Sequence, residues 1–323
     1  MFSNSILQLC VLIVLWYSVS SLANIIGKRL LTVFPHPITV TLAQLFHGWA
    51  YSVPLLRLMN ISPPTYLYST RIYYITIIVP LAIGKLLSQL TSQISLRLVP
   101  VSYTHTVKAL MPLFTVILSR FVIGEAQSFI IYFSLIPIIV GVIIASMSEL
   151  SFDTTGFISA LFSTGLLAVQ NVYSKKTLKH IDIHHLALLS ILSKIAWCLL
   201  VPFWFLLDGP QIDVQGEVTN NNHHHHHHSL IFYMLIDGFC NFIYNVLAFT
   251  MISRLSPLSY VIAGSSKRLV VIIISILVLH NPVTKMNLFG IGLALIGVLL
   301  YNKIKYDEKK QTVLLQIPIS PLP

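Results

Sequence analysis

Long apolar runs recur along the whole chain and constrain its fold more than any other feature of the sequence. A helix needs about 20 apolar residues to cross a bilayer, and backbone inside lipid must satisfy its own hydrogen bonds. Hydrophobic residues make up 55% of the 323 residues and charged residues only 9%, too few to cover the surface of a soluble globule. The sequence therefore predicts an all-α polytopic membrane protein.

The apolar runs give ten predicted transmembrane helices when the chain is scanned for stretches of about twenty residues. They cover residues 5–27, 38–58, 72–96, 101–122, 127–147, 154–175, 184–207, 229–254, 257–279 and 284–302. Connections between them are short except at residues 208–228, where Gly, Pro, Asn and acidic residues predict a flexible loop. The histidine tract at residues 223–228 is a low-complexity segment, natural or engineered, and supports no functional assignment.

The two halves of the chain resemble each other. Residues 97–103 (RLVPVSY) match residues 254–260 (RLSPLSY), and a lysine follows at membrane depth in each half, Lys108 and Lys267. A unit of five helices is odd, so its copy must enter the bilayer from the opposite side. This pattern predicts two inverted five-helix repeats, which are typical of alternating-access carriers. The predicted parts are a first repeat at residues 1–150, a second at residues 151–305 and a cytosolic tail at residues 306–323.

The distribution of basic residues predicts the topology. Lys and Arg gather in the even-numbered connections and in the carboxyl-terminal tail, which by the positive-inside rule places both termini in the cytosol. The sequon at Asn60 then lies on the cytosolic side and should stay unmodified. The first apolar run predicts a retained anchor without a plastid-type presequence. We therefore expect residence in the endomembrane system, in the Golgi or the endoplasmic reticulum.

Lys267 and Arg268 are adjacent in the middle of the ninth predicted helix. A cation at bilayer depth costs about 3 kcal/mol on insertion scales unless it faces water, a counter-charge or an anionic ligand. Snorkelling to a headgroup layer, or neutralising a buried carboxylate, would be purely structural explanations. An anion site accounts for the pair better, because a guanidinium can bind phosphate or carboxylate with two hydrogen bonds while an ammonium adds a compact charge.

Three other predicted helices carry polar residues on one face. On the fourth, Thr104 and Lys108 are four residues apart and His105 flanks them. His105 is either a proton-sensitive contact or a structural histidine. The polar residues of the third and eighth helices are Lys85, Gln89 and Ser92, and Asp237, Asn241, Tyr244 and Asn245.

Asp237 is the only acidic residue deep in a predicted helix. We expect it to form a structural or gating ion pair with Lys85 or Lys194, and a direct ligand role is the alternative. The histidines, cysteines and acidic residues show no metal-ligand spacing, so no metal site and no soluble cofactor is predicted.

Several motifs follow one another in the order of a known family. They are residues 101–109 (VSYTHTVKA), 134–137 (SLIP), 149–152 (ELSF), 173–176 (YSKK), 244–245 (YN) and 257–258 (PL), followed by Lys267 and Arg268. Together they resemble the triose-phosphate and sugar-phosphate translocators of the drug/metabolite transporter superfamily. The chain looks most similar to animal endomembrane members of the nucleotide-sugar transporter group.

This resemblance implies ten helices in two inverted halves and strict exchange with inorganic phosphate. It also implies that Lys108, Lys267 and Arg268 hold the phosphate and that Tyr244 contacts the rest of the substrate. The third-helix histidine and threonine of the plastid members align with Gln89 and Ser92, so the organic end of the site has changed. The substrate of the plastid members therefore does not carry over. The expected remainder of the pocket is Gln89, Ser92, Thr104, His105 and Tyr244.

These features predict a secondary transporter that exchanges a phosphorylated small metabolite of the sugar-phosphate type for inorganic phosphate by alternating access. A nucleotide-sugar transporter of the same fold is the nearest alternative, and a non-transporting membrane receptor or scaffold is another. No paired carboxylates or ligand cluster indicate an enzyme. The net charge of +10 comes without a nucleic-acid-binding motif, so the expected partners are the anionic solutes and the lipid bilayer. The sequence leaves the oligomeric state open, a homo-oligomer included.

Overall fold

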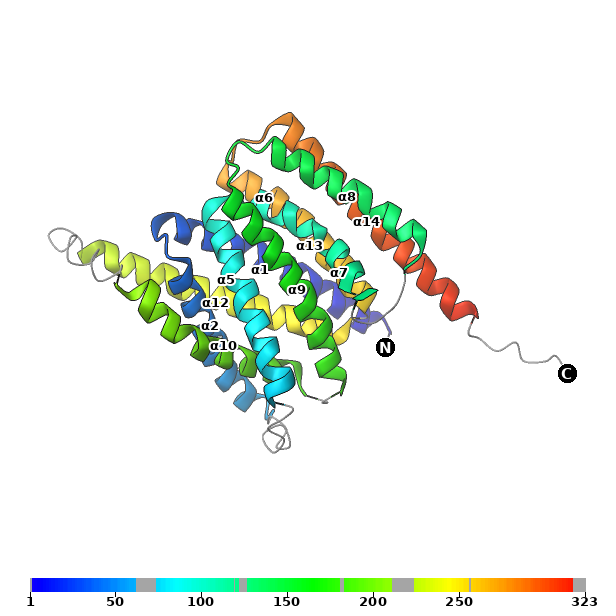
Figure 1. The fold of residues 1–323 in the computed structure, drawn as a ribbon. Helices are drawn as coiled ribbons and strands as arrows, with labels where there is room; N and C mark the ends of the chain where they lie inside the picture. The colour runs from blue at the N-terminus through cyan, green and yellow to red at the C-terminus, as the bar shows by residue number, and fades with distance from the viewer. Residues whose placement is uncertain are drawn as a thin grey trace.

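The computed structural model is a bundle of long helices that lie side by side (Figure 1). It describes residues 2–61, 74–118, 120–121, 127–180, 183–210, 224–255 and 257–315, and no strand occurs among them. The helices are α1 (Phe2–Val33), α2 (Pro37–Leu58), α5 (Val79–Leu98, preceded by a π turn at Tyr74–Ile78), α6 (Val101–Val107), α7 (Met111–Leu118), α8 (Phe129–Met147), α9 (Thr154–His180), α10 (His185–Leu207), α12 (His224–Arg254), α13 (Pro257–Leu279) and α14 (Lys285–Leu315).

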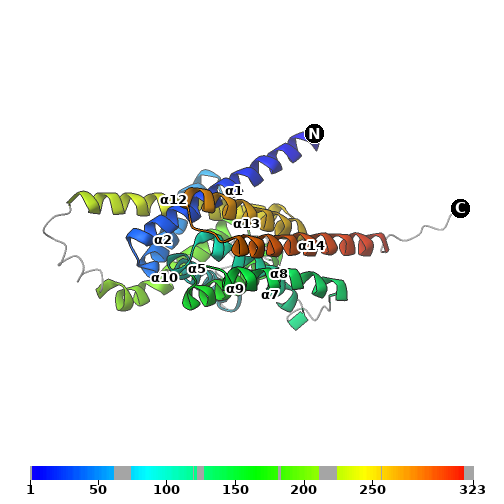
Figure 2. The ribbon, with the colours of Figure 1, turned by 90° about the horizontal axis from the view of Figure 1, so that it is seen from above.

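The prediction of a polytopic all-α membrane protein is confirmed. In the described ranges, nine helical segments are long and apolar enough to cross a membrane. The helix α2, predicted as a span at residues 38–58, is not among these nine, although its 22 residues match a span in length and it packs against α10, α12 and α5. The start of α1 and the end of α14 lie toward the same end of the bundle (Figures 1 and 2).

Two predicted boundaries do not coincide with helix ends in the structure. The predicted loop at residues 208–228 ends earlier, because α12 begins at His224. The predicted second repeat ends at residue 305, but α14 continues without a break to Leu315. Lys, Glu and Gln follow the apolar part of α14, and these residues favour helix, so the helix outlasts the hydrophobic stretch that a hydropathy scan detects.

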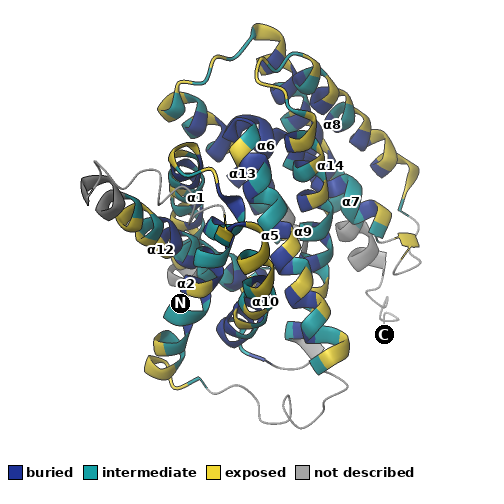
Figure 3. Cartoon of the chain, turned by 60° about the vertical axis from the view of Figure 1, so that its left-hand side comes forward, coloured by how far each residue is buried: buried dark blue, intermediate teal, exposed yellow. Residues whose placement is uncertain are grey.

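The outer surface of the bundle is apolar, as a lipid-facing surface requires. In Figure 3 the buried residues face the centre of the bundle and the exposed ones face outward. Exposed large side chains include Phe129, Phe133 and Ile136 on α8 and Phe289 on α14. Large apolar side chains on the outer surface and charged side chains in the interior differ from the arrangement in a soluble protein, because lipid is the solvent here.

The helices α8 and α14 pack with their backbones almost in contact (Figure 1). A Cβ atom built on Gly141 would lie 2.4 Å from the Ala294 nitrogen, and one built on Gly290 would lie 2.5 Å from the Ala145 nitrogen. Small residues at such positions let helices approach closely in membranes, where lipid supplies no hydrophobic force between helices. The glycines of these two helices therefore determine how closely the pair packs.

We predict that Gly290→Ala destabilises the protein, because the new methyl group meets backbone atoms that cannot rotate away. The expected cost is about 1–3 kcal/mol, seen as a lower melting temperature of the protein in detergent. Gly292→Ala on the same helix is the matched control, since nothing lies within 4 Å of a Cβ built there. Equal melting temperatures for the two variants would contradict the prediction.

Candidate anion-binding cavity

A cavity of about 680 Å³ lies inside the bundle and is lined by helices from both halves of the chain. Its walls come from α1, α2, α5, α6, α7, α9, α12, α13 and α14, with Lys108 from the short turn between α6 and α7. Six basic side chains and one acidic side chain line it: Lys85, Lys108, Lys175, Lys267, Arg268 and Lys305, and Glu308. The excess of positive charge favours an anionic ligand.

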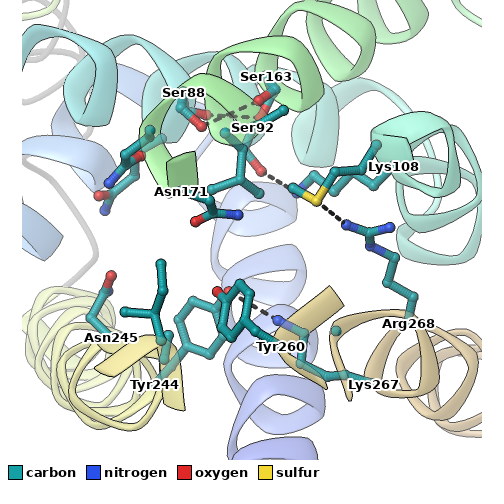
Figure 4. A pocket seen from close by; sticks show the side chains of 18 of the residues that line it. Ser88, Ser92, Lys108, Ser163, Asn171, Tyr244, Asn245, Tyr260, Lys267 and Arg268 are labelled. Atoms are coloured by element: carbon teal, nitrogen blue, oxygen red, sulfur yellow. Dashed lines mark hydrogen bonds between the residues drawn. The ribbon is translucent and has the colours of Figure 1, made fainter. Parts of the chain in front are cut away.

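Most residues predicted for the site reach this cavity. Lys108, Lys267 and Arg268 line it together with Gln89, Ser92, His105 and Tyr244. Figure 4 shows Lys108 and Arg268 entering from one side of the pocket and Asn245 lying on the opposite side. The fourth and ninth predicted helices, far apart in the sequence, thus contribute to one site.

Lys108 lies at a break in its helix. The α-helix α6 ends at Val107, a 3₁₀ turn covers Lys108–Leu110, and α7 begins at Met111. Pro112 has no N–H for the carbonyl of Lys108, four residues earlier, and the N–H of Met111 donates to that carbonyl instead. The side chain enters the cavity, where its Nζ donates to Ser92 Oγ at 2.7 Å.

Lys267 is held between aromatic rings. Its Nζ lies 4.4 Å from the centroid of the Trp16 ring and 4.7 Å from that of the Tyr244 ring, and it donates to the Tyr244 hydroxyl at 3.1 Å. Trp16 in turn stacks on Tyr260. The π faces partly stabilise the ammonium and leave its charge uncompensated.

Arg268 is buried, with 7% of its surface exposed, and meets a thioether rather than a carboxylate. Its Nη2 donates to Met111 Sδ at 2.8 Å. A thioether is a weak acceptor, so the fork of guanidinium donors remains largely unsatisfied. Among the described residues, no carboxylate forms a salt bridge with Lys108, Lys267 or Arg268. The structural explanation of a buried carboxylate does not apply to these three cations within the described ranges.

His105 is a buried contact at the edge of the same cavity. Its Nε2 lies 3.0 Å from Asn24 Oδ1, whose amide nitrogen donates to the Ser20 carbonyl. Nε2 therefore carries a hydrogen, because the facing amide oxygen can only accept. The other ring nitrogen, Nδ1, is buried and has no hydrogen-bond partner.

Two expectations for the site were wrong. Thr104 does not line the cavity; its hydroxyl lies 3.1 Å from Ser95 Oγ and donates to the Pro100 carbonyl. The helical register of α6 turns Thr104 toward α5, while Lys108, one turn later, reaches the cavity through the 3₁₀ turn. The single helical face that was expected to carry both Thr104 and Lys108 is therefore split by the break.

The expected ion pair of Asp237 is not formed either. Asp237 Oδ2 accepts from Gln44 Nε2 at 2.7 Å. Lys85 Nζ instead lies 3.5 Å from Asn245 Oδ1, and the exposed Lys194 lies over the Trp49 ring. Gln44, an amide on α2 that no sequence pattern placed here, donates a hydrogen bond to the carboxylate in place of a lysine.

Amide side chains form a continuous wall beside Asp237. Gln44 Oε1 accepts from Gln89 Nε2 and from Gln93 Nε2, both at 2.8 Å, while its own nitrogen donates to Asp237. The network joins α5, α2 and α12 on the buried side of the cavity. Sequence reasoning missed Gln44, and also the cavity residues Trp16, Asn24 and Asn171, because single polar or aromatic residues in apolar helices give no periodic signal.

The fold and the cavity define a class of protein: a multi-pass membrane protein with a cationic cavity that helices from both halves of the chain line, as carriers of anionic solutes require. The model of the Triose-phosphate Transporter family matches residues 7–302. The chain belongs to this family.

Curated relatives cover most of the chain. Phosphoenolpyruvate/phosphate translocator 3, chloroplastic, of Oryza sativa subsp. japonica is 35% identical over 94% of this chain and 76% of its own. A triose phosphate/phosphate translocator of non-green plastids from Brassica oleracea var. botrytis is 32% identical over 95% of this chain and 75% of its own. The particular similarity to animal endomembrane carriers stays a prediction.

One solved crystal structure shares the fold. It superimposes with a TM-score of 0.55 over 91% of this chain and 95% of its own, at 14% identity. In the part of the chain that the structure describes, no group of three or more His, Cys, Asp or Glu side chains gathers that could hold a metal ion.

We predict that inorganic phosphate raises the melting temperature of the purified protein in detergent. A ligand that binds only the folded state at 100 times its dissociation constant stabilises it by about 2.7 kcal/mol. Arg268→Gln should abolish the increase, because the amide has neither the charge nor the fork of donors. Potassium chloride at matched ionic strength and Lys194→Gln are the controls. An undiminished increase in Arg268→Gln would contradict the site.

Proposed function

We propose that the protein exchanges a phosphorylated small metabolite for inorganic phosphate across a membrane by alternating access. The observation that carries this proposal is the convergence of Lys108, Lys267 and Arg268 on one cavity without a described carboxylate in a salt bridge to them. A phosphate group carries up to two negative charges and accepts several hydrogen bonds, so it matches two ammonium groups and a guanidinium.

The names of the relatives support the same function. They include phosphoenolpyruvate/phosphate and triose phosphate/phosphate translocators that are 30–35% identical to this chain. Exchange rather than uniport also follows from the charges of the cavity. Closing the cavity around three uncompensated cations without an anion would be costly, so the empty carrier should reorient slowly.

We further propose that the halves are inverted repeats that open in turn at opposite ends of the cavity. Lys28, near the end of α1, donates its Nζ to the carbonyl oxygens of Leu96 at 2.8 Å and Val99 at 3.0 Å, at the end of α5. The last carbonyls of a helix have no partner inside it and carry partial negative charge. An ammonium group therefore binds them favourably and can hold the ends of the two helices together.

Lys175 makes the corresponding contact in the second half. Near the end of α9, its Nζ donates to the carbonyl oxygen of Ile252 at 2.9 Å and to that of Leu255, at the end of α12. The helices α1 and α5 are the first and third predicted spans, and α9 and α12 are the sixth and eighth. In alternating spans, these two contacts lie at opposite ends of the cavity.

We predict that proteoliposomes containing the protein take up labelled phosphate only when they are preloaded with phosphate or an organic phosphate. Lys267→Ala and Arg268→Ala should each reduce the exchange rate by more than about tenfold, because a charge-assisted hydrogen bond contributes about 1.5–3 kcal/mol. Lys194→Ala, an exposed lysine outside the cavity, is the matched control. Normal exchange by both cavity variants would refute the binding assignment.

The same vesicles separate the alternatives. The volume of about 680 Å³ also admits a nucleotide sugar, and stronger inhibition by nucleoside monophosphates than by sugar phosphates would favour that substrate. Absence of uptake into every preloaded set, with folded wild-type protein, would favour a non-transporting receptor or scaffold. The assay thus discriminates all three functions.

We predict that removing either lysine contact changes access to the cavity from one side only. In a variant whose native cysteines are replaced by serine, Asn171→Cys reports access to an impermeant thiol reagent. Lys28→Met should speed labelling from the side on which α1 ends, and Lys175→Met from the other side, each several-fold. Faster labelling from the same side in both variants would contradict the inverted arrangement.

The membrane of residence also belongs to the proposal. The distribution of basic residues supports an orientation with both termini in the cytosol. We propose residence in the endomembrane system, whereas the relatives named above are chloroplastic. Imaging of the tagged protein beside Golgi, endoplasmic reticulum and plastid markers tests the location. Glycosylation at Asn60 would contradict the orientation.

A further inference from the structure

The cavity has basic side chains at two separate places, which we call its two poles. Lys108, Lys267 and Arg268, assigned to phosphate, form one pole, and Lys85 forms the other. It lies on α5, lines the cavity and has only 4% of its surface exposed. Its ammonium lies 3.5 Å from Asn245 Oδ1 and 5.6 Å from the centroid of the Phe249 ring. A long amide contact and a distant ring compensate little of the cost of burying a charge.

A structural counter-charge does not account for this lysine. Asp237 is the acidic residue that was expected to pair with Lys85. It does not line the cavity, and its carboxylate accepts a hydrogen bond from Gln44. Within the described ranges, no carboxylate forms a salt bridge with Lys85. A buried lysine that lines a cavity with no acid bound to it is a candidate for ligand binding.

Lys85 lies across the cavity from the phosphate-binding residues. Ser92, which binds Lys108, is seven residues further along α5, a rise of about 10 Å. On α12 the neighbouring residues Tyr244 and Asn245 contact different lysines. Tyr244 accepts a hydrogen bond from Lys267, and Asn245 accepts one from Lys85. Figure 4 shows Asn245 on the opposite side of the pocket from Lys108 and Arg268.

The space between the poles is lined by uncharged polar groups. Gln89, one turn from Lys85 on α5, and Asn241, one turn from Asn245 on α12, both line the cavity. Amides can bind hydroxyl groups as donors and as acceptors. The cavity therefore offers a cationic end, a polar middle and a second cationic end.

We propose that Lys85, together with Asn245, binds a second anionic group at the far end of the phosphorylated substrate. The inference rests on the proposed function, because it assumes that the substrate phosphate occupies the other pole. The substrate class is an organic phosphate whose tail carries anionic oxygens, supplied by a carboxylate or by a second phosphate. Inorganic phosphate lacks such a tail and uses only the pole of Lys108, Lys267 and Arg268.

The test compares competitors that differ only in the tail. Proteoliposomes loaded with phosphate take up labelled phosphate in the presence of glycerol 3-phosphate or 3-phosphoglycerate, which differ by a hydroxymethyl group and a carboxylate. Fructose 6-phosphate and fructose 1,6-bisphosphate form the second pair, in which the additional anion is a phosphate. The pair with the larger preference for the anionic tail identifies which group Lys85 binds.

Wild-type protein should prefer the anionic tail in at least one pair by about tenfold or more. Lys85→Met should remove that preference and leave phosphate self-exchange and inhibition by the neutral-tail competitor unchanged, because methionine keeps the apolar stem beside Phe249. Lys85→Arg should keep the preference. Lys194→Met, outside the cavity, is the matched control and should behave as wild type.

Asn245→Asp provides a second variant if Lys85→Met does not fold. Its carboxylate would lie beside Lys85 and occupy the subsite, so the preference for anionic tails should fall while phosphate self-exchange persists. The inference is overturned by a wild-type protein without preference in either pair, or by Lys85→Met that exchanges phosphate with the preference intact. Loss of phosphate self-exchange in the wild type would instead overturn the proposed function itself.

Discussion

Burial of cations at membrane depth without bound carboxylates is the constraint on which the rest of this structure depends. Lys267 and Arg268 are at most 9% exposed, and their described contacts are aromatic rings, a hydroxyl and a thioether. Such contacts lower the cost of burial without cancelling the charge. The bundle therefore contains a polar cavity, which helices from both halves of the chain line, and we propose that an anion completes the site.

The helices around the cavity are joined at their ends by contacts between lysines and backbone carbonyls. The ends of α5 and α12 are held by lysines from α1 and α9, through backbone carbonyls rather than carboxylates. By contrast, α8 and α14 are fixed by glycines that bring their backbones into close approach. We propose that this closely packed pair stays together while the helices joined by lysine contacts move around a fixed site.

The sequence was most informative where chemistry is unusual for its surroundings. A pair of cations in an apolar run is costly, so Lys267 and Arg268 could be recognised without a structure, and Lys108 followed from its place in the matching half. The predictions were wrong where they depended on which way a side chain points from its helix or on which residue it contacts. Thr104 was expected beside Lys108, but the register of α6 directs it toward Ser95, and the 3₁₀ turn before Pro112 brings only Lys108 of the two into the cavity. Asp237 was expected to bind a lysine, but it binds Gln44.

The sequence by itself determined the solvent and the class of fold, because runs of about twenty apolar residues have few stable alternatives to membrane helices. It also indicated which cations are costly to bury, since that cost depends on how far from the end of an apolar run each cation lies. Only the tertiary structure decided which side chains meet: Trp16 under Lys267, Gln44 on Asp237, and Lys85 beside Asn245. These contacts join residues far apart in the chain, so their geometry depends on helix packing and not on any local pattern.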